Sequence, residues 1–282
     1  MKIVILGKGY VGNYIFNHLA QNKELDSVSI FSRSELDYSD PLELRKFIDI
    51  ETTVINAAGF TGRPNVDEGE LKKQLCWSLN VAMPLAINKA CKAVGAEVIH
   101  ITSGCIYTGY EKEWEEGDEP NFGVFSNESS FYSKTKHAFE SLSDYGLNIR
   151  VRMPFCDTLH ERSFLSKILN YDTLVDTLNS KTYIPDLCDF VEQYIVQGYQ
   201  GHETINFSNG DPLNTSEIVD MMKEKGIANE NWSWADWEGI DTKASRSNCI
   251  LDTTRLKEQY HFNIRSEYDA LELALDKIKL GL

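Results

Sequence analysis

The amino-acid sequence predicts an α/β fold, built on a doubly wound parallel sheet and followed by a second, smaller domain. A chain of 282 residues with 42% hydrophobic residues is long and apolar enough to bury a full core. Up to about residue 150, short β-branched runs alternate with helical stretches, which is the rhythm of βαβ units. The strand-like runs are apolar on both faces, as strands of a buried parallel sheet are.

In the first half of the chain, strands are predicted over 2–6, 27–32, 53–57 and 97–102, because each is a short apolar run of this kind. The stretches between them, 10–21, 41–48 and 70–94, are predicted as helices. Pro84 lies inside the longest of these, so we expect that helix to bend at its middle.

In the second half the same pattern continues and then loosens. A helix is predicted over 132–145, with Phe139 and Leu142 on one face, and a strand over 147–152. Beyond Pro154 the predicted elements are helices over 163–171, 189–197 and 215–225 and a strand over 204–208. We therefore predict one domain over 1–153 and a second over 154–282, with 185–208 returning to the first sheet. Trp232, Trp234 and Trp237 are expected to form a small core in the second domain.

The charge and cysteine content exclude several classes of protein. A net charge of -15 disfavours binding to nucleic acid or an anionic membrane, and no apolar run approaches the roughly 20 residues that span a bilayer. The first residues open directly into a strand, so we expect a soluble, cytoplasmic protein. The six cysteines contain no C-x-x-C pair, which predicts free thiols and no metal site.

A glycine-rich motif follows the first predicted strand and opens the first helix. Its glycines are Gly7, Gly9 and Gly12, with Tyr10 and Val11 between the last two. In this position the first glycine makes a tight turn, the second lets the backbone approach a pyrophosphate, and the third lets helix pack on strand. We interpret residues 1–153 as a dinucleotide-binding domain of the Rossmann type; a glycine-rich turn without a ligand is the alternative.

The end of the second strand favours NADP(H). An NAD-binding protein places an acid there, whereas this chain has Ser32 and Arg33. Arg33, with Ser32 or Ser34, could hold a 2′-phosphate by charge-assisted hydrogen bonds. A solvated surface arginine is the alternative.

Tyr132 and Lys136 are spaced to lie one turn apart on a helix. Composition alone predicts about one such Tyr-x-x-x-Lys pair, so the match needs support from elsewhere. Ser103 supplies it, because it follows the strand ending at Thr102, at the sheet edge where ligand sites form.

These motifs, in this order, resemble the extended short-chain dehydrogenase/reductases that act on nucleotide sugars. The resemblance implies that Lys136 grips the nicotinamide ribose. It implies further cofactor contacts from one short segment and three single positions: Asn56, Ala57, Ala58, Gly59, Asn80, Tyr132 and Pro154.

Longer blocks are similar to the bifunctional UDP-4-keto-6-deoxyglucose 3,5-epimerase/4-reductases that complete UDP-L-rhamnose synthesis. The blocks extend to about residue 256 and comprise 56–67, 103–107, 119–122, 131–136, 150–154, 246–248 and 251–252. The family spaces its glycines Gly-x-x-Gly-x-x-Gly, and this chain is one residue shorter. The resemblance implies NADPH-dependent 3,5-epimerisation and 4-keto reduction of a UDP- or dTDP-linked sugar.

A single oxygen-binding site could serve both reactions. Tyr132 would give the C4 oxygen its proton, Ser103 would donate a hydrogen bond to it, and Lys136 with the oxidised nicotinamide would lower the pKa of Tyr132. The enolates formed by proton loss at C3 or C5 would place their charge on the same oxygen.

Inversion also needs an acid or base on each face of the sugar ring. Cys105 is the candidate for one face, since an ordinary thiol titrates near neutrality and the similar epimerase/reductases carry cysteine there. A buried, inert cysteine is the alternative. Lys167 matches a lysine of the family and is the candidate for the other face, with His160 nearby as a second option.

Substrate contacts are implied by the resemblance. Arg246 is expected to face the diphosphate, and Asn121 or the turn with Arg63 and Asn65 is expected to touch the sugar or nicotinamide region. The acidic run 111–119 is expected to be a solvated loop.

Two other functions remain open on the same scaffold. One is a reductase alone, similar to dTDP-4-dehydrorhamnose reductase, which would have no need of Cys105. The other is a non-catalytic NADP-binding regulatory protein, which the presence of Ser103, Tyr132 and Lys136 argues against. The sequence leaves the oligomeric state open, although exposed apolar helix faces in this fold often pair into homodimers.

Overall fold

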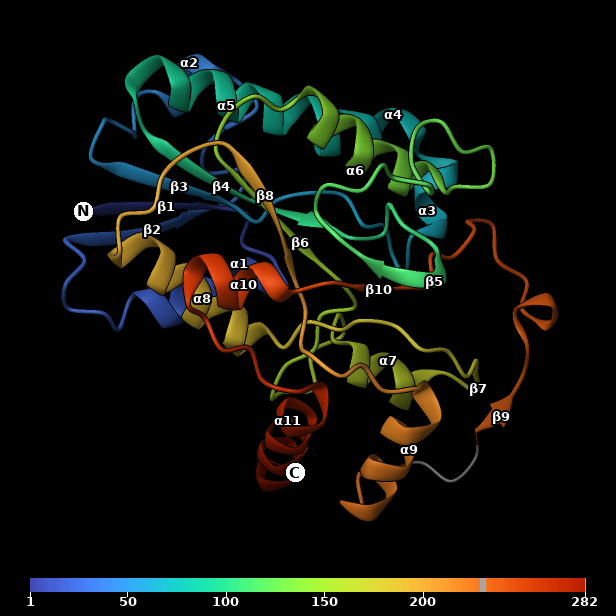
Figure 1. Ribbon diagram of the computed structural model, residues 1–282. Helices are drawn as coiled ribbons and strands as arrows, with labels where there is room; N and C mark the ends of the chain where they lie inside the picture. Colours follow the sequence, from blue (N-terminus) through green and yellow to red (C-terminus); the bar gives the residue numbers. More distant parts are fainter. Residues whose placement is uncertain (229–231, 282) are drawn as a thin grey trace.

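The centre of the molecule is a parallel sheet of six strands (Figure 1). In the computed structural model, which describes residues 1–228 and 232–281, every neighbouring pair in this sheet is parallel. The strands in spatial order are β2 (Ser27–Phe31), β1 (Lys2–Leu6), β3 (Thr52–Asn56), β4 (Glu97–Ser103), β6 (Leu147–Val151) and β8 (Glu203–Phe207). The predicted α/β fold with a parallel sheet is confirmed.

Helices cover both faces of the sheet, as Figure 1 shows. One layer contains α1 (Tyr10–Leu19), α8 (Ile184–Val196) and α10 (Thr254–Tyr260); the other contains α2 (Pro41–Leu44), α5 (Met83–Val94) and α6 (Phe131–Leu142). Successive side chains of a strand point to opposite faces. Accordingly, Ile3 and Ile5 of β1 belong to the core shared with α1 and α8, whereas Val4 and Leu6 belong to the core shared with α2 and α5.

The order of the strands reverses at β1. The chain passes from β1 outward to β2 and then returns to place β3 on the other side of β1. The loops that follow β1 and β3 therefore leave the same edge of the sheet in opposite directions, and a crevice opens between them. Ligands of open α/β sheets bind at such a switch point.

A second group of helices packs away from the sheet. These are α7 (Phe164–Asn170), α9 (Thr215–Glu224) and α11 (Glu267–Gly281), which share a core of their own. Short strand pairs lie beside them: β7 (Thr173–Leu174) with β9 (Ser233–Trp234), and β5 (Gly109–Trp114) with β10 (Cys249–Leu251). A single turn of 3-10 helix covers Trp237–Gly239.

The long helix expected over 70–94 is divided. It begins earlier, as α3 (Asp67–Leu71), breaks at Lys72, and resumes as α4 (Lys73–Trp77), a π-helical turn (Ser78–Ala82) and α5. Pro84 has no N–H to donate to the carbonyl four residues before it, and the wider turn directly upstream accommodates the missing bond. A bend at Pro84 was predicted, but the break at Lys72 and the π-helical turn were not.

Other boundaries also differ from the predictions. The helix expected over 41–48 ends at Leu44, and the one expected from 189 begins at Ile184, with Pro185 in its first turn. The acidic run expected as a loop contains most of β5, and α10 and α11 were not predicted. The tryptophan core was wrong in part: Trp232 packs on the helices of the second group, but Trp234 is exposed.

Candidate active site

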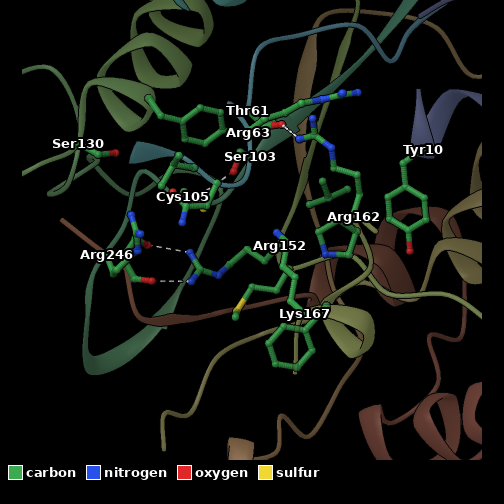
Figure 2. A pocket seen from close by; sticks show the side chains of 18 of the residues that line it. Tyr10, Thr61, Arg63, Ser103, Cys105, Ser130, Arg152, Arg162, Lys167 and Arg246 are labelled. Carbon is green, nitrogen blue, oxygen red and sulfur yellow. Dashed lines mark hydrogen bonds between the residues drawn. The ribbon is translucent and has the colours of Figure 1, made fainter. Parts of the chain in front are cut away.

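A cavity of about 1020 Å³ opens at the carboxyl edge of the sheet, between the loops after β1 and β3 and the second group of helices. Figure 2 shows part of its wall. Most of the predicted site residues line it: Gly9, Tyr10, Val11, Ala57, Ala58, Gly59, Arg63, Asn65, Ser103, Cys105, Tyr132, Lys136, Pro154, His160, Lys167 and Arg246.

The three glycines after β1 have different surroundings. Gly7 has a φ of +108°, and a Cβ there would lie 2.8 Å from the backbone nitrogen of Ala58. A Cβ on Gly12 would lie 2.0 Å from the carbonyl oxygen of Gly7, so only glycine lets α1 pack this closely on the turn. Gly9 has open space around its Cβ position and no side chain capping α1. The loop thus fits the predicted roles, with free N–H groups at the helix start for a diphosphate.

The loop after β3 is held from behind by two asparagines. Asn56 accepts a hydrogen bond from the N–H of Ala58 at 3.1 Å. Asn80, in the π-helical turn, exchanges two hydrogen bonds with the backbone of Phe60, at 2.7 and 2.9 Å. Neither asparagine lines the cavity, and neither do Gly7 and Gly12. These four predicted cofactor residues shape the loops rather than face the cavity.

Ser103, Tyr132 and Lys136 meet at one side of the cavity. Ser103 is the last residue of β4, and the other two lie one turn apart on α6; all three are buried. The Nζ of Lys136 lies 5.7 Å from the centre of the Tyr132 ring. The N–H of Cys105 donates to Ser103 Oγ at 3.2 Å, which leaves the Ser103 hydroxyl proton free to be donated.

Burial dominates the pKa of Tyr132 in the chain alone. Burial raises this pKa, the charge of Cys105 raises it further, and the neighbouring Ser103 and the charge of Arg152 only partly offset the rise. Burial also lowers the pKa of Lys136. The chain by itself therefore keeps Tyr132 protonated at neutral pH, which is the form that can donate a proton.

Cys105 differs from the other cysteines. It is partly exposed and lines the cavity, whereas the remaining five cysteines are buried. A cysteine used only as a small apolar core residue would be buried as well. Its position beside Ser103 (Figure 2) makes its thiol accessible to a ligand held by that hydroxyl.

Lys167 lies on α7, so it comes from a different part of the wall. Burial lowers its pKa, and the charges of Arg162 and Arg246 lower it further. A lysine in this setting gives up its proton more readily than a solvated one. His160 lies farther toward the first glycine loop, where its ring stacks on Tyr10 with centres 4.4 Å apart.

Some predicted contacts are not brought to the cavity. Asn121 does not line the cavity: its side-chain oxygen accepts from the N–H of Thr108 at 2.9 Å, and its side-chain nitrogen donates to the carbonyl of Thr108 at 2.7 Å. Ser32 and Arg33 also do not line it. Sequence reasoning missed an acid nearby: Glu35 accepts hydrogen bonds from the Ser32 N–H and hydroxyl and from Lys8.

Two polar contacts of cavity-wall arginines were not predicted. Arg162 donates from Nη1 to Thr61 Oγ1 at 2.6 Å and to the carbonyl of Gly62 at 2.9 Å, so it joins the second group of helices to the loop after β3 (Figure 2). Asp67 forms an ion pair with Arg246 at 2.9 Å. Both pairs join residues far apart in sequence, so no local pattern identifies them.

The cavity is positive although the chain is strongly negative. Its cationic side chains outnumber its acids, which are Glu161, Asp172 and Asp241. The cations are Lys8, Arg63, Lys136, Arg152, Arg162, Lys167 and Arg246. A cleft of one sign inside a surface of the other attracts oppositely charged ligands, here anionic ones. Within the described ranges, no group of three potential metal ligands occurs and no helix is long and apolar enough to span a membrane.

Comparison with known proteins finds one family over almost the whole chain. The model of the RmlD substrate binding domain matches residues 1–280. A bifunctional dTDP-4-dehydrorhamnose 3,5-epimerase/dTDP-4-dehydrorhamnose reductase of Arabidopsis thaliana is 33% identical over 231 residues, 75% of this chain and 74% of that protein. A trifunctional UDP-glucose 4,6-dehydratase/UDP-4-keto-6-deoxy-D-glucose 3,5-epimerase/UDP-4-keto-L-rhamnose-reductase of the same plant is 32% identical over 74% of this chain but only 32% of its own length.

Solved structures share the fold. The UDP-rhamnose synthase of Acanthamoeba polyphaga mimivirus superposes with a TM-score of 0.86 at 24% identity, over 99% of both chains. A dTDP-4-dehydrorhamnose reductase from Bacillus anthracis, solved in complex with NADP, gives a TM-score of 0.80 at 18% identity over 96% of both chains.

Proposed function

Since the chain belongs to the RmlD substrate-binding domain family, we propose that it is a reductase of the dTDP- or UDP-4-dehydrorhamnose type that uses NADP(H). Its substrate would be a nucleotide-linked 4-keto-6-deoxyhexose. The observation that carries this proposal is the meeting of Ser103, Tyr132 and Lys136 in one cationic cavity beside the glycine-rich loop. A nucleotide diphosphate and a phosphorylated dinucleotide are both anions that such a cavity suits.

We also propose that the chain inverts C3 and C5 before reduction, giving UDP-L-rhamnose. The support is Cys105, which is partly exposed beside Ser103 and has no role in reduction alone. Lys167 supports it too, because a half-desolvated lysine on another wall supplies a second proton-exchanging group.

In the reduction, Ser103 and Tyr132 hold the C4 oxygen of the sugar. The bound cofactor supplies a hydride to C4. Tyr132, kept protonated by burial, gives its proton to the oxygen as negative charge develops there, and Ser103 donates a second hydrogen bond. Lys136 lies beside the Tyr132 ring, and its proposed role is to bind the ribose of the cofactor.

In the epimerisation, the C4 carbonyl acidifies the hydrogens on C3 and C5. Removal of either proton moves negative charge to the C4 oxygen, which Ser103 and Tyr132 already hold. The proton must leave from one face of the ring and return to the other. Cys105 and Lys167 would serve these two faces.

The cofactor preference rests on the residues after β2. Arg33 is exposed, has a side chain with no hydrogen-bond partner among the described residues, and follows the strand end where a 2′-phosphate would lie. Glu35 is held by Lys8 and Ser32, so its charge is partly neutralised by a partner of opposite sign. Arg63, Asn65 and Arg246 are proposed as contacts to the substrate, Arg246 through the part of its guanidinium not paired with Asp67.

The experiment is to supply UDP-4-keto-6-deoxyglucose with NADPH or NADH and to identify the sugar formed. UDP-L-rhamnose formed with NADPH, and no added enzyme, is the expected result. Absence of turnover with any 4-keto-6-deoxyhexose nucleotide would refute the proposal and leave a non-catalytic NADP-binding protein.

A reductase without epimerase activity is the second candidate. It is favoured by relatives named only as dTDP-4-dehydrorhamnose reductase, one of which, from Mycolicibacterium smegmatis, is 29% identical over 142 residues. In that case, NADPH would be oxidised only after a separate epimerase has been added to the same mixture.

A further inference from the structure

Arg152 is a buried arginine in the cavity wall, and all its hydrogen-bond partners among the described residues are neutral. Its side chain is 1% exposed. Nη1 donates to the carbonyl of Gly104 at 3.2 Å and to Ser247 Oγ at 2.8 Å. Nη2 donates to Asn179 Oδ1 at 2.5 Å and to the carbonyl of Ser247 at 3.0 Å. Figure 2 shows Arg152 on the same side of the cavity as Ser103 and Cys105.

A neighbouring arginine shows the more usual arrangement. Arg150, two residues earlier on β6, is buried to a similar degree, but it pairs with the carboxylate of Glu140 through Nε and Nη2, both at 2.8 Å. An ion removed from water costs several kcal/mol unless an opposite charge offsets it. Within residues 1–228 and 232–281, no carboxylate lies within 4.0 Å of Arg152, so the cavity wall keeps a net positive charge.

This charge lies against the turn that joins Ser103 to Cys105. Gly104 is the residue between them, and a Cβ on it would lie 3.1 Å from Cγ of Arg152. The Nε of Arg152 is itself buried and has no hydrogen-bond partner within the described chain. Both N–H donors of each Nη atom are used within the chain, so the guanidinium influences its surroundings mainly by its charge.

The backbone fixes Arg152 in place. Its N–H donates to Thr182 Oγ1 at 3.0 Å, and its carbonyl accepts from the N–H of Thr182 at 2.8 Å. The next residue, Met153, has a φ of +37°, a backbone conformation that residues other than glycine rarely adopt. Such strain persists where the surroundings dictate the conformation, often at functional sites.

We propose that Arg152 is an electrostatic positioning residue whose fixed charge stabilises negative charge on the sulfur of Cys105 and on the sugar oxygen beside Ser103. The part concerning the sugar oxygen rests on the proposed function; the part concerning Cys105 does not. Burial raises the pKa of Tyr132 and Arg152 opposes that rise, as a positive charge close to this corner must.

The test is the rate at which iodoacetamide alkylates Cys105 in the folded chain at pH 7, without nucleotide or sugar. Cys105 is the cysteine open to reagent, and Cys105→Ser gives the background rate. Arg152→Met removes the charge at similar size and should slow alkylation about tenfold, which corresponds to about 1.4 kcal/mol. Arg152→Lys keeps the charge and should stay within about threefold of the unchanged chain.

Ser247→Ala separates the charge from the packing, since it removes a hydrogen bond to Arg152 but leaves the guanidinium. Cys105 should be alkylated in this variant at the rate of the unchanged chain. The proposal is overturned if Arg152→Met reacts at the original rate, or if Arg152→Met, Arg152→Lys and Ser247→Ala are slowed alike, which would mean a structural role.

If Arg152→Met fails to fold, as judged by circular dichroism, a second measurement on the unchanged chain tests the proposal. The rate at which anionic iodoacetate alkylates Cys105 is divided by the rate for neutral iodoacetamide. A fixed positive charge should make this ratio higher than the ratio for N-acetylcysteine, and an equal or lower ratio overturns the proposal. These readouts need no turnover. If the chain does not act on 4-keto sugars but Arg152→Met still slows the alkylation of Cys105, the proposed function is refuted and the electrostatic effect of Arg152 on Cys105 is retained.

Discussion

Single side chains at one corner of the cavity decide what chemistry the chain can carry out. Burial raises the pKa of Tyr132, so this residue carries its proton at neutral pH and we expect it to be the proton donor in reduction. Tyr132→Phe should lower kcat for NADPH oxidation by about 10²–10⁴-fold, the contribution of a general acid. NADPH binding, measured by fluorescence titration, should change little. A variant that keeps a tenth or more of its kcat would show that another group donates the proton.

Cys105 is expected to act only in epimerisation. Cys105→Ala should reduce an already inverted 4-keto sugar at the normal rate yet incorporate no solvent deuterium at C3 or at C5, whichever carbon it serves. Nuclear magnetic resonance of the sugar in D₂O measures both positions. If deuterium still enters both carbons, the role assigned to Cys105 is wrong.

Lys167 gives the site a pH dependence. Its pKa is lowered by burial and by the charges of Arg162 and Arg246. Lys167 should therefore lose its proton at a lower pH than an ordinary lysine does. If Lys167 acts as the acid, deuterium exchange should decline over that same pH range. Arg246→Met removes one of these charges, raises the pKa of Lys167 and should shift the decline to higher pH. Arg63→Met, which removes a cavity cation that does not act on Lys167, is the control and should leave the decline in place.

Single site residues could be predicted from the sequence where the chemistry requires certain residue types at a fixed spacing. Tyr132 and Lys136 on one helix, with Ser103 at a strand end, could be placed together before any coordinates. Asn121 could not be judged, because its pairing with Thr108 depends on how the intervening segment folds back. Arg152 was equally hidden, since its partners come from residues 104, 179 and 247.

At the scale of elements, the turn from β1 into α1 offers a matched pair of variants. The methyl group added by Gly9→Ala would have no atom within 4 Å, whereas the methyl group added by Gly12→Ala would lie 2.0 Å from the carbonyl oxygen of Gly7. Gly9→Ala should keep the Tm but weaken NADPH binding about tenfold or more, since the methyl stands where the diphosphate approaches. Gly12→Ala should lower the free energy of unfolding by about 1–3 kcal/mol or more. If Gly9→Ala binds NADPH as tightly as the unchanged chain does, the diphosphate does not lie against this turn.

Element boundaries show where local patterns stop being sufficient. The strands of the sheet were predicted to within a residue or two, because their apolar, β-branched runs are dictated by burial on both faces. The break at Lys72 and the π-helical turn before Pro84 were not, since the turn lets Asn80 reach the backbone of Phe60, a contact across 20 residues. The short strand β5 depends on pairing with β10, more than 130 residues away in the sequence.

At the scale of the whole molecule, a buried ion pair ties the C-terminal helix to the body of the chain. Lys181 Nζ lies 2.8 Å from Glu267 Oε1, with both side chains at most 1% exposed. Lys181→Met or Glu267→Gln should each lower the free energy of unfolding by about 3–5 kcal/mol, because each leaves a buried charge or its partner uncompensated. The double variant Lys181→Met/Glu267→Leu should recover part of this loss in chemical denaturation. Additive losses would mean that the two groups do not interact.

The distribution of charge also belongs to this scale. A chain with a net charge of -15 concentrates cations in the cavity at the carboxyl edge of its sheet, and the composition alone could not reveal this. The negative total predicted small ligands over nucleic acid, while the positive cavity, formed by residues from both ends of the chain, indicates that these ligands are anionic.

The central claim is that one oxygen-binding site serves the two inversions and the reduction, and Ser103→Ala tests it most directly. In D₂O with UDP-4-keto-6-deoxyglucose and NADPH, three rates are measured: deuterium entry at C3, deuterium entry at C5, and NADPH oxidation, the last on an already inverted sugar. Loss of one hydrogen bond to the shared oxygen should lower all three rates by a similar factor, about 10²–10³-fold. A fall in NADPH oxidation with unchanged deuterium entry at both carbons would contradict the account.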